Sequence, residues 1–412
     1  MKKWISLFLS AVLLCGVCVL PASAAGGKLQ LSEEISVSAD YDWERFRGQN
    51  ITLNVYNWGE YISNGADGSP DVVALFQQLT GIQINYTTFD SNETMYAKIK
   101  SGAATYDVIF PSEYMVAKMR DEGMLAQLDL ANIPNFRQID AEYTNQDYDP
   151  HNLHSVPYMW CTTGIIYNTT MVQRAPTAWA DLWSEDYAGS ILMFNNSRDA
   201  FAIAAHKLGM SINPSQPEQV ALAIEDLKQQ KPLVQAYVMD EIFDKMEGGE
   251  AAVGVYYSGD AITMISDNPD LAWVFPSEGV TLSIDNMCVP AGSAHKEAAE
   301  MFINFMCEVD VGAANCEYIG YSTPSSAVRQ QLSEELQNSP IAYPGDEVME
   351  KAQLFTSLSA EINDELDVQW SEMKSYNEGG NAYTMLLLLG AAVALSGFNI
   401  WRKVRKKMRA TY

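Results

Sequence analysis

The sequence predicts an α/β protein of two lobes whose sheet is mainly parallel. Segments typical of strands alternate with segments typical of helices through most of the 412 residues, an order that favours α/β architecture. The region between two apolar terminal segments is roughly 350 residues long, which exceeds the usual size of one hydrophobic core. The extended run VPYMWCTTGIIYN at 156–168 is suited to crossing from one lobe to the other.

The two ends of the sequence indicate export and anchoring. Lys2 and Lys3, the apolar run after them and PASAA at 21–25 form the pattern of a signal peptide cleaved after Ala24. Residues 383–401 carry no charge and precede RKVRKKMR. About 20 apolar residues cross a bilayer as a helix, and a basic cluster beside them stays cytoplasmic. We therefore expect an extracytoplasmic domain between a signal peptide at 1–24 and a membrane anchor, with a transmembrane helix at 383–401 and a basic cytoplasmic tail at 402–412.

The elements of the exported region are expected in the following order. Residues 25–48 are polar and acidic and should form a spacer. Strand, helix, strand, helix and strand follow at 51–58, 70–81, 82–89, 92–102 and 106–112. After the crossing strand, the second lobe contains 178–183, 189–194, a helix at 197–209 and 251–265. Two strands within 271–292 lead back to a helix at 295–309 and the segment 318–329. This order assigns 49–163 and 284–329 to the first lobe, and 164–283 and 330–378 to the second.

The charge of the exported region favours cationic ligands. All 52 acidic residues lie between the terminal segments, whereas eight of the 26 Lys and Arg residues lie within those segments. The region between them therefore has 18 basic and 52 acidic residues, a net charge of −34. Nucleic-acid binding is disfavoured because no basic patch could neutralise phosphates. The long-range field attracts cations instead, although an acidic exported surface also serves solubility.

No catalytic or cofactor motif is found. HExxH, GxSxG, a P-loop and GxGxxG after a strand are all missing from the sequence. His151 and His154 lie near Asp147 and Asp149 at a spacing that could ligate a metal, but histidines in a polar loop are more often solvated. The exported cysteines have no CxxC spacing; Cys307 and Cys316 could pair, or all four could remain buried thiols. We predict no enzyme activity, cofactor or metal site.

Aromatic and acidic residues recur together where predicted strands end. YNWGEY at 56–61 surrounds one acid with three aromatic residues directly after a strand, where α/β folds place ligand contacts. Aromatic faces attract ammonium groups, and carboxylates accept charge-assisted hydrogen bonds from them. The pattern predicts a site for a flexible organic cation. Its candidate residues are Trp58, Glu60, Tyr61, Ser112, Tyr114, Asn196, Asp199, Tyr257, Asp260, Asp285 and Tyr321.

Several of these residues also have a purely structural interpretation. Asp199 fits the first turn of a helix, where the macrodipole favours an acid. Ser112 and Asp260 could cap helices, and Tyr321 could pack beneath the turn at Pro324. Tyr256 and Tyr257 are consecutive, as in ferric-ion sites, although a strand end in a Tyr-rich chain explains them equally well.

Several stretches resemble the spermidine/putrescine-binding proteins of ABC polyamine importers. They are YNWGEY, SNETMYAKIKSGAATYDVIFPSEYMVAKMRDEGML at 91–125, SVPYMWCTTGIIYN, TAWADLW, INFM and IGYSTP, and the resemblance extends from about residue 49 to about residue 375. It implies a periplasmic-binding-protein fold, type II-like, whose two lobes close on a ligand in the cleft between them. It also implies that Glu60 meets an amine and that Asp285 is central to polyamine recognition. The other contacts implied by the resemblance are Trp58, Tyr61, Ser112, Tyr114, Asp199, Asp260 and Tyr321.

The chain also departs from this family pattern. Gly59 stands where a hydroxyl residue is common, and Asn196 where spermidine binders often carry Asp. Tyr257 stands where Trp is usual and Ser283 where an aromatic residue is usual, whereas Asp260 matches putrescine-selective members. The preference between spermidine and putrescine is therefore open.

The leading hypothesis is a membrane-tethered polyamine receptor that serves the permease of an ABC importer. A polyamine sensor or scaffold that signals through its transmembrane segment is the second possibility. A binding protein for another cation, such as ferric ion, is the third.

Overall fold

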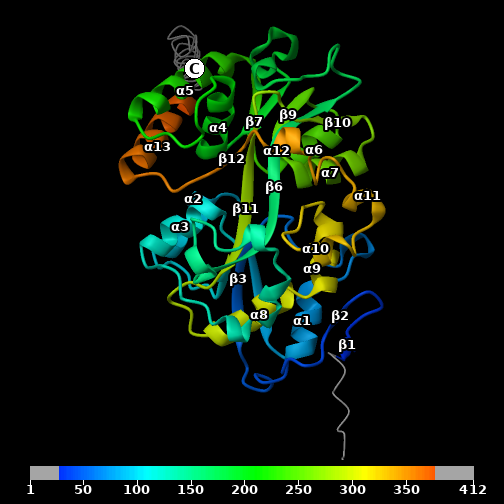
Figure 1. Cartoon of the computed structure of the whole chain (residues 1–412). Helices are drawn as coiled ribbons and strands as arrows, with labels where there is room; N and C mark the ends of the chain where they lie inside the picture. The colour runs from blue at the N-terminus through cyan, green and yellow to red at the C-terminus, as the bar shows by residue number, and fades with distance from the viewer. Residues whose placement is uncertain (1–26, 376–412) are drawn as a thin grey trace, which may run out of the picture.

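The computed structural model describes residues 27–375. Figure 1 shows two lobes, one above the other, joined by the long strands β6 (Ser155–Asn168) and β11 (Val280–Cys288). The predicted signal peptide, transmembrane helix and basic tail lie outside the described residues. The lobe boundaries given above stay a prediction.

The principal sheet of the described region has ten strands. Eight follow the order β4-β3-β5-β11-β6-β9-β7-β8, while β10 pairs with β6 and β12 with β11. The remaining bounds are β3 (Thr52–Trp58), β4 (Gln83–Phe89), β5 (Val108–Ile109), β7 (Ile191–Phe194), β8 (Val234–Val238), β9 (Val253–Tyr257), β10 (Leu271–Val274) and β12 (Ala352–Leu354).

The sheet is mixed, which refines the expectation of a mainly parallel one. Within the first lobe β3 is parallel to β4 and β5, and within the second β7 is parallel to β8 and β9. Between the lobes β6 is antiparallel to β11, and it also runs antiparallel to β9 and β10. The chain leaves the first lobe along β6 and returns along β11, so these two neighbouring strands run in opposite directions.

The first lobe has helices of which α1 and α8 meet through phenylalanine side chains. The helices are α1 (Val72–Thr80), α2 (Asn92–Lys100), α3 (Glu113–Asp121), α8 (Lys296–Met306), α9 (Val309–Ile319) and α10 (Ser326–Arg329). Asp71 caps α1 by accepting from the Ala74 amide, and Gly81 ends it at a φ of 77°. The buried Phe76 of α1 meets Phe302 of α8 edge-on, with 5.0 Å between ring centroids.

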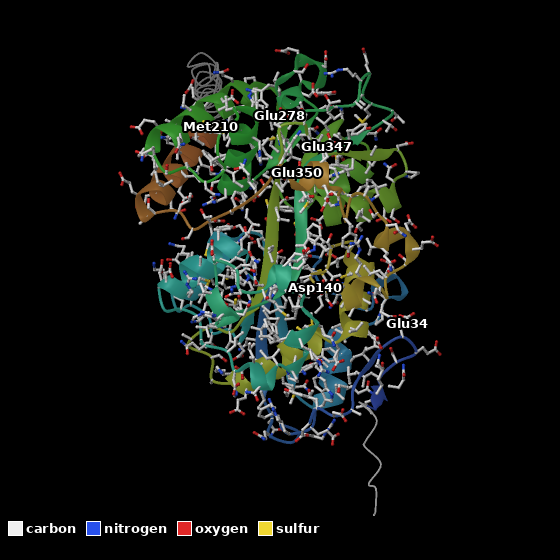
Figure 2. The ribbon with its side chains drawn as sticks, viewed as in Figure 1. Glu34, Asp140, Met210, Glu278, Glu347 and Glu350 are labelled. Atoms are coloured by element: carbon white, nitrogen blue, oxygen red, sulfur yellow. The ribbon has the colours of Figure 1, made fainter. Side chains whose placement is uncertain are left out.

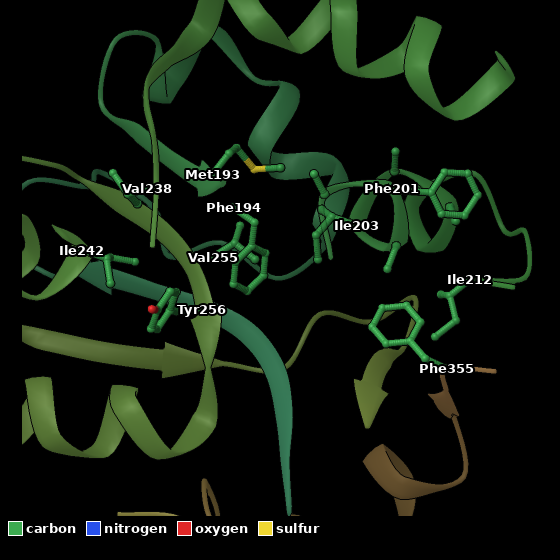
Figure 3. Packing of buried hydrophobic residues seen from close by; sticks show 14 of the residues in the cluster. Met193, Phe194, Phe201, Ile203, Ile212, Val238, Ile242, Val255, Tyr256 and Phe355 are labelled. Carbon is green, nitrogen blue, oxygen red and sulfur yellow. The ribbon is translucent and has the colours of Figure 1, made fainter. Parts of the chain in front are cut away.

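The second lobe has a core built on α4. Its helices are α4 (Ser197–Lys207), α5 (Pro217–Gln230), α6 (Glu241–Glu247), α7 (Ser258–Asp267) and α13 (Ala360–Ser375); the short helices α11 (Glu334–Gln337) and α12 (Asp346–Met349) lie on the returning segment. Figure 3 shows Ile203 of α4 on the side of Phe194 of β7, and Phe201 on the far side of the same helix. Residues 197–206 are all buried, because sheet, α5 and α13 surround this helix. This packing fixes the start of α4, where Asp199 lies.

Residues 25–48 differ from the expected polar spacer. β1 (Lys28–Gln30) and β2 (Ser36–Ser38) form an antiparallel hairpin, and Ile35, Val37 and Trp43 are buried. The Trp43 indole donates to the Ser38 carbonyl at 2.8 Å. The sequence analysis missed this part of the core because acidic residues separate these apolar side chains along the chain.

Acidic side chains are spread over both lobes. Figure 2 labels Asp140 on the first lobe and Glu278, Glu347 and Glu350 on the second. No helix within residues 27–375 combines the length and the apolar character needed to cross a bilayer. Cys161, Cys288, Cys307 and Cys316 are buried free thiols, so Cys307 and Cys316 do not form a disulfide.

Candidate functional site

A cavity between the two lobes gathers ten of the eleven candidate residues. Several lie where an element ends or begins: Trp58 ends β3, Tyr257 ends β9, and Ser112 directly precedes α3, whereas Asp285 lies within β11. The carboxyl ends of the parallel strands meet at this level, as in other α/β sheets. The ten residues are Trp58, Glu60, Tyr61, Ser112, Tyr114, Asp199, Tyr257, Asp260, Asp285 and Tyr321.

Asp285 of β11 is held by two hydroxyl groups of the first lobe. Tyr61 donates to Oδ2 at 2.6 Å and Ser112 donates to Oδ1 at 2.7 Å. Asn92 in turn donates to the Ser112 hydroxyl at 3.0 Å. Burial raises the pKa of Asp285 to about 6, and both hydroxyl groups oppose that rise by stabilising the carboxylate. The arrangement fixes the orientation of this acid from both sides.

Tyrosine hydroxyls also hold the other acids around the cavity. Tyr257 donates to Oδ2 of Asp199 at 3.0 Å, and Tyr321 donates to Oδ2 of Asp260 at 2.9 Å. Tyr114 donates to Oε1 of Glu93, which does not itself line the cavity, at 2.9 Å. In the pairs of Asp199 and Asp260, one carboxylate oxygen is satisfied and the other remains able to accept a hydrogen bond from a ligand. The aromatic rings and the acids predicted from sequence thus form pairs.

The acids of the cavity are desolvated. Burial raises the pKa of Asp199 to about 7 and raises that of Asp260 well above its ordinary value. Within residues 27–375, Asp199, Asp260 and Asp285 form no ion pair with Lys, Arg or His. The Arg198 guanidinium lowers the pKa of Asp199, yet it stacks over the Tyr114 and Phe355 rings, 4.9 and 4.5 Å from their centroids. A ligand carrying positive charge would complement these acids.

Asn196 is the candidate residue that does not line the cavity. Its side chain caps α4 by accepting from the amides of Arg198 and Asp199. This is a structural task, since it satisfies amides that the first turn of a helix leaves unpaired. The prediction of Asn196 as a direct ligand contact is therefore not supported by its position, whereas its cap orients Asp199.

The sequence analysis did not identify some of the residues that line the cavity. Asp240 lies just after β8 and Phe355 just after β12, two strands that were not predicted. Asp90 follows β4, which was predicted, so the rule that ligands bind at strand ends could have identified it. Met239, Phe243 and Tyr256 complete the wall of the second lobe.

Among the described residues, no group of three or more His, Cys, Asp and Glu side chains is placed to hold a metal ion. His154, one of the two histidines with suggestive spacing, instead places Nδ1 3.1 Å from Oδ1 of Asp149. Asp149 also accepts from the Ser155 amide and hydroxyl, both at 2.8 Å. This loop therefore has a local structural role at the start of β6.

Two lobes joined by crossing strands around an acidic cavity define a binding protein that encloses a small solute. The chain belongs to the bacterial extracellular solute-binding proteins, since the model of that family matches residues 71–344.

The chain is similar in sequence to several characterised binding proteins. The chain is 38% identical to a spermidine/putrescine-binding periplasmic protein of Salmonella typhimurium over 306 residues, 74% of this chain and 86% of the relative. It is 37% identical to the protein of that description from Escherichia coli, with the same shares covered. It is 28% identical to the putrescine-binding periplasmic protein SpuD of Pseudomonas aeruginosa over 345 residues, 79% of this chain and 92% of the relative.

Solved structures agree with the fold. A putative spermidine/putrescine ABC transporter protein from Listeria monocytogenes is 34% identical, with a TM-score of 0.75 over 79% of this chain and 99% of that one. The substrate-binding protein PotD from Streptococcus pneumoniae is 38% identical, with a TM-score of 0.67 over 80% and 100%. The expected periplasmic-binding-protein fold is confirmed.

Proposed function

We propose that the chain is an extracytoplasmic receptor that binds a polyamine, spermidine or putrescine, and delivers it to an ABC importer. It acts by binding and release and has no catalytic role. The names of its relatives and the chemistry of the cavity support the same ligand class. The proposed contacts are the ten cavity residues identified above.

One observation carries this proposal: Asp199, Asp260 and Asp285 are buried around one cavity and form no ion pair within the described residues. Burying a carboxylate is costly unless a positive charge or hydrogen bonds compensate it. Ammonium groups of a polyamine would supply both. The aromatic walls would cover the methylene groups between them and attract the ammonium charge.

Closure of the lobes would exclude water from these contacts. The cavity walls come from both lobes, so a ligand between them would favour the closed arrangement, as in other hinge-closing binding proteins. A permease in the membrane would then recognise the closed receptor.

Calorimetric titration of the purified protein with putrescine, cadaverine, spermidine and spermine tests the proposal. We expect saturable binding with one ligand per chain for spermidine or putrescine. Absence of heat with all four amines, together with iron-dependent colour, would favour the ferric-ion alternative and contradict the polyamine proposal.

We also propose that residues 383–401 anchor the receptor beside its permease, a proposal that rests on their apolar sequence and the basic stretch after them. Cell fractionation tests it. The full-length protein should sediment with membranes, and a chain ending at residue 382 should not. Equal distribution of both forms would contradict the anchor.

A further inference from the structure

Asp240 is an acid at the mouth of the cavity that the family resemblance does not assign. It lies between β8 and α6 in the second lobe and lines the cavity beside Glu60 and Asp260. Tyr256 donates to its Oδ1 at 3.1 Å, which repeats the pairing of tyrosine and carboxylate seen for Asp199 and Asp260. Within residues 27–375, its Oδ2 receives no hydrogen bond and forms no ion pair. One oxygen of Asp240 is thus fixed and the other is free to accept from a ligand.

Tyr256 is a rigid support for this acid. Figure 3 shows its ring at the edge of the second-lobe core, beside Ile242 and close to Phe194. The Tyr256 and Phe194 rings stack with 5.6 Å between centroids, and Phe243 meets Tyr256 edge-on at 6.2 Å. Only 2% of Tyr256 is exposed. Its hydroxyl therefore holds Asp240 at a defined place although Asp240 itself is partly open to solvent.

Gly59 of the first lobe makes room for the Asp240 carboxylate. A Cβ atom at position 59 would fall well inside van der Waals contact with Oδ2 of Asp240 and 3.5 Å from its Cγ. A larger residue at 59 would therefore require the Asp240 carboxylate to move from its present position. Gly59 in the first lobe therefore faces Asp240 in the second, and the absence of a side chain at position 59 leaves space for the carboxylate.

The acids of the cavity divide into an inner and an outer group. Glu60, Asp240 and Asp260 also line a wider opening beside the cavity, whereas Asp199 and Asp285 do not. The two groups are connected through tyrosines, because Tyr61 donates to Asp285, Tyr321 donates to Asp260, and these two rings meet edge-on. Asp240 therefore adds a carboxyl group to the outer group.

We infer that Asp240, admitted to the cleft by Gly59, is a specificity-determining residue that binds an ammonium group beside Glu60 and favours polyamines with three or more charges. The inference rests on the proposed function, since it assumes that polyamines occupy this cavity. A diamine has two ammonium groups, which the inner acids Asp199 and Asp285 can bind. A triamine such as spermidine has a third ammonium group, which the outer acids can bind.

Titration of D240N with spermidine and putrescine tests the inference. We expect spermidine affinity to fall about fivefold or more, because a charge-assisted contact at a partly solvated site is lost. Putrescine affinity should change less than twofold. D270N is the control, since Asp270 is exposed in the second lobe and lines neither the cavity nor the wider opening beside it; it should leave both affinities unchanged.

A double variant separates a direct role from a general loss of charge. G59S should displace Asp240 and reduce spermidine affinity to the level of D240N. G59S/D240N should be no weaker than D240N alone, because both changes remove the same contact. Additive losses, or equal losses for spermidine and putrescine in D240N, would overturn the inference. A wild-type protein that binds neither amine would instead refute the proposed function itself.

Discussion

The Tyr321 hydroxyl of the first lobe donates to Oδ2 of Asp260 in the second lobe at 2.9 Å. The same ring lies against the first turn of α7, so close that a Cβ atom on Gly259 would fall inside it. Tyr321 also meets Tyr61 edge-on, with 4.7 Å between centroids, and Tyr61 holds Asp285. Tyr321 therefore makes a contact between the lobes and also contacts Tyr61, which holds Asp285.

Closure should depend on the missing side chain at Gly259. In Gly259→Ala the new methyl group would overlap the Tyr321 ring, so the lobes could not approach as they do here. We expect polyamine affinity to fall about tenfold or more, because the binding-competent state becomes rare. Small-angle scattering should show less compaction on adding ligand than in the wild type. Gly292→Ala is the control, since a Cβ there meets nothing within 4 Å; equal behaviour of the two variants would refute this view of closure.

Asp285 should be essential for all polyamines. Its two oxygens accept from Tyr61 and Ser112, and an Asn side chain has only one oxygen to accept with. Asp285→Asn would also remove the central negative charge, so we expect affinity to fall about 100-fold or more, the usual scale for a buried charged contact. Asp270→Asn, at an exposed position of the second lobe, should bind normally. Retained spermidine and putrescine binding in Asp285→Asn would exclude a carboxylate-centred site.

Local patterns in the sequence predicted the elements that carry most of the site, but not their partners. Alternation of apolar residues predicted β3, strand-like composition predicted β4, a long extended run predicted β6, and Pro and Gly marked the ends of α1. β12 has only three residues and β8 lacks a clear alternation, so Asp240 and Phe355 after them were missed. The pairing of Tyr61 with Asp285 joins residues 224 positions apart. Such contacts arise only when β11 returns to the first lobe and pairs with β5 and β6, which one sequence does not reveal.

Trp58 should contribute to binding through its ring. It ends β3, lines the cavity and packs against Phe89 with 4.5 Å between centroids. Trp58→Ala should weaken binding by about 1–2 kcal/mol through loss of apolar cover and of attraction for ammonium. The circular dichroism spectrum should remain that of the wild type. An unchanged dissociation constant would remove Trp58 from the proposed contacts.

Affinity should fall as the pH falls from 8 to 5. Burial raises the pKa of Asp199 to about 7 and that of Asp285 to about 6, so these acids become protonated in the ligand-free protein over this range. Ammonium groups stabilise the ionised form, and binding must therefore release protons. Titrations in buffers of different ionisation enthalpy should detect this release, largest between pH 6 and 7. A dissociation constant that stays the same from pH 8 to 5 would contradict a carboxylate site.

The same groups should make the ligand-free protein more stable at lower pH. A carboxyl group whose folded-state pKa lies above its unfolded value binds protons more strongly when folded, so the free energy of unfolding falls as the pH rises through that interval. For Asp199 the interval runs from its ordinary value of 3.8 to about 7. Asp199→Asn removes this penalty, so the variant should gain melting temperature over the wild type at pH 8 and gain less at pH 5. Thermal unfolding of both proteins at the two pH values measures the difference, and an equal gain at pH 8 and pH 5 would show that Asp199 does not titrate in this range.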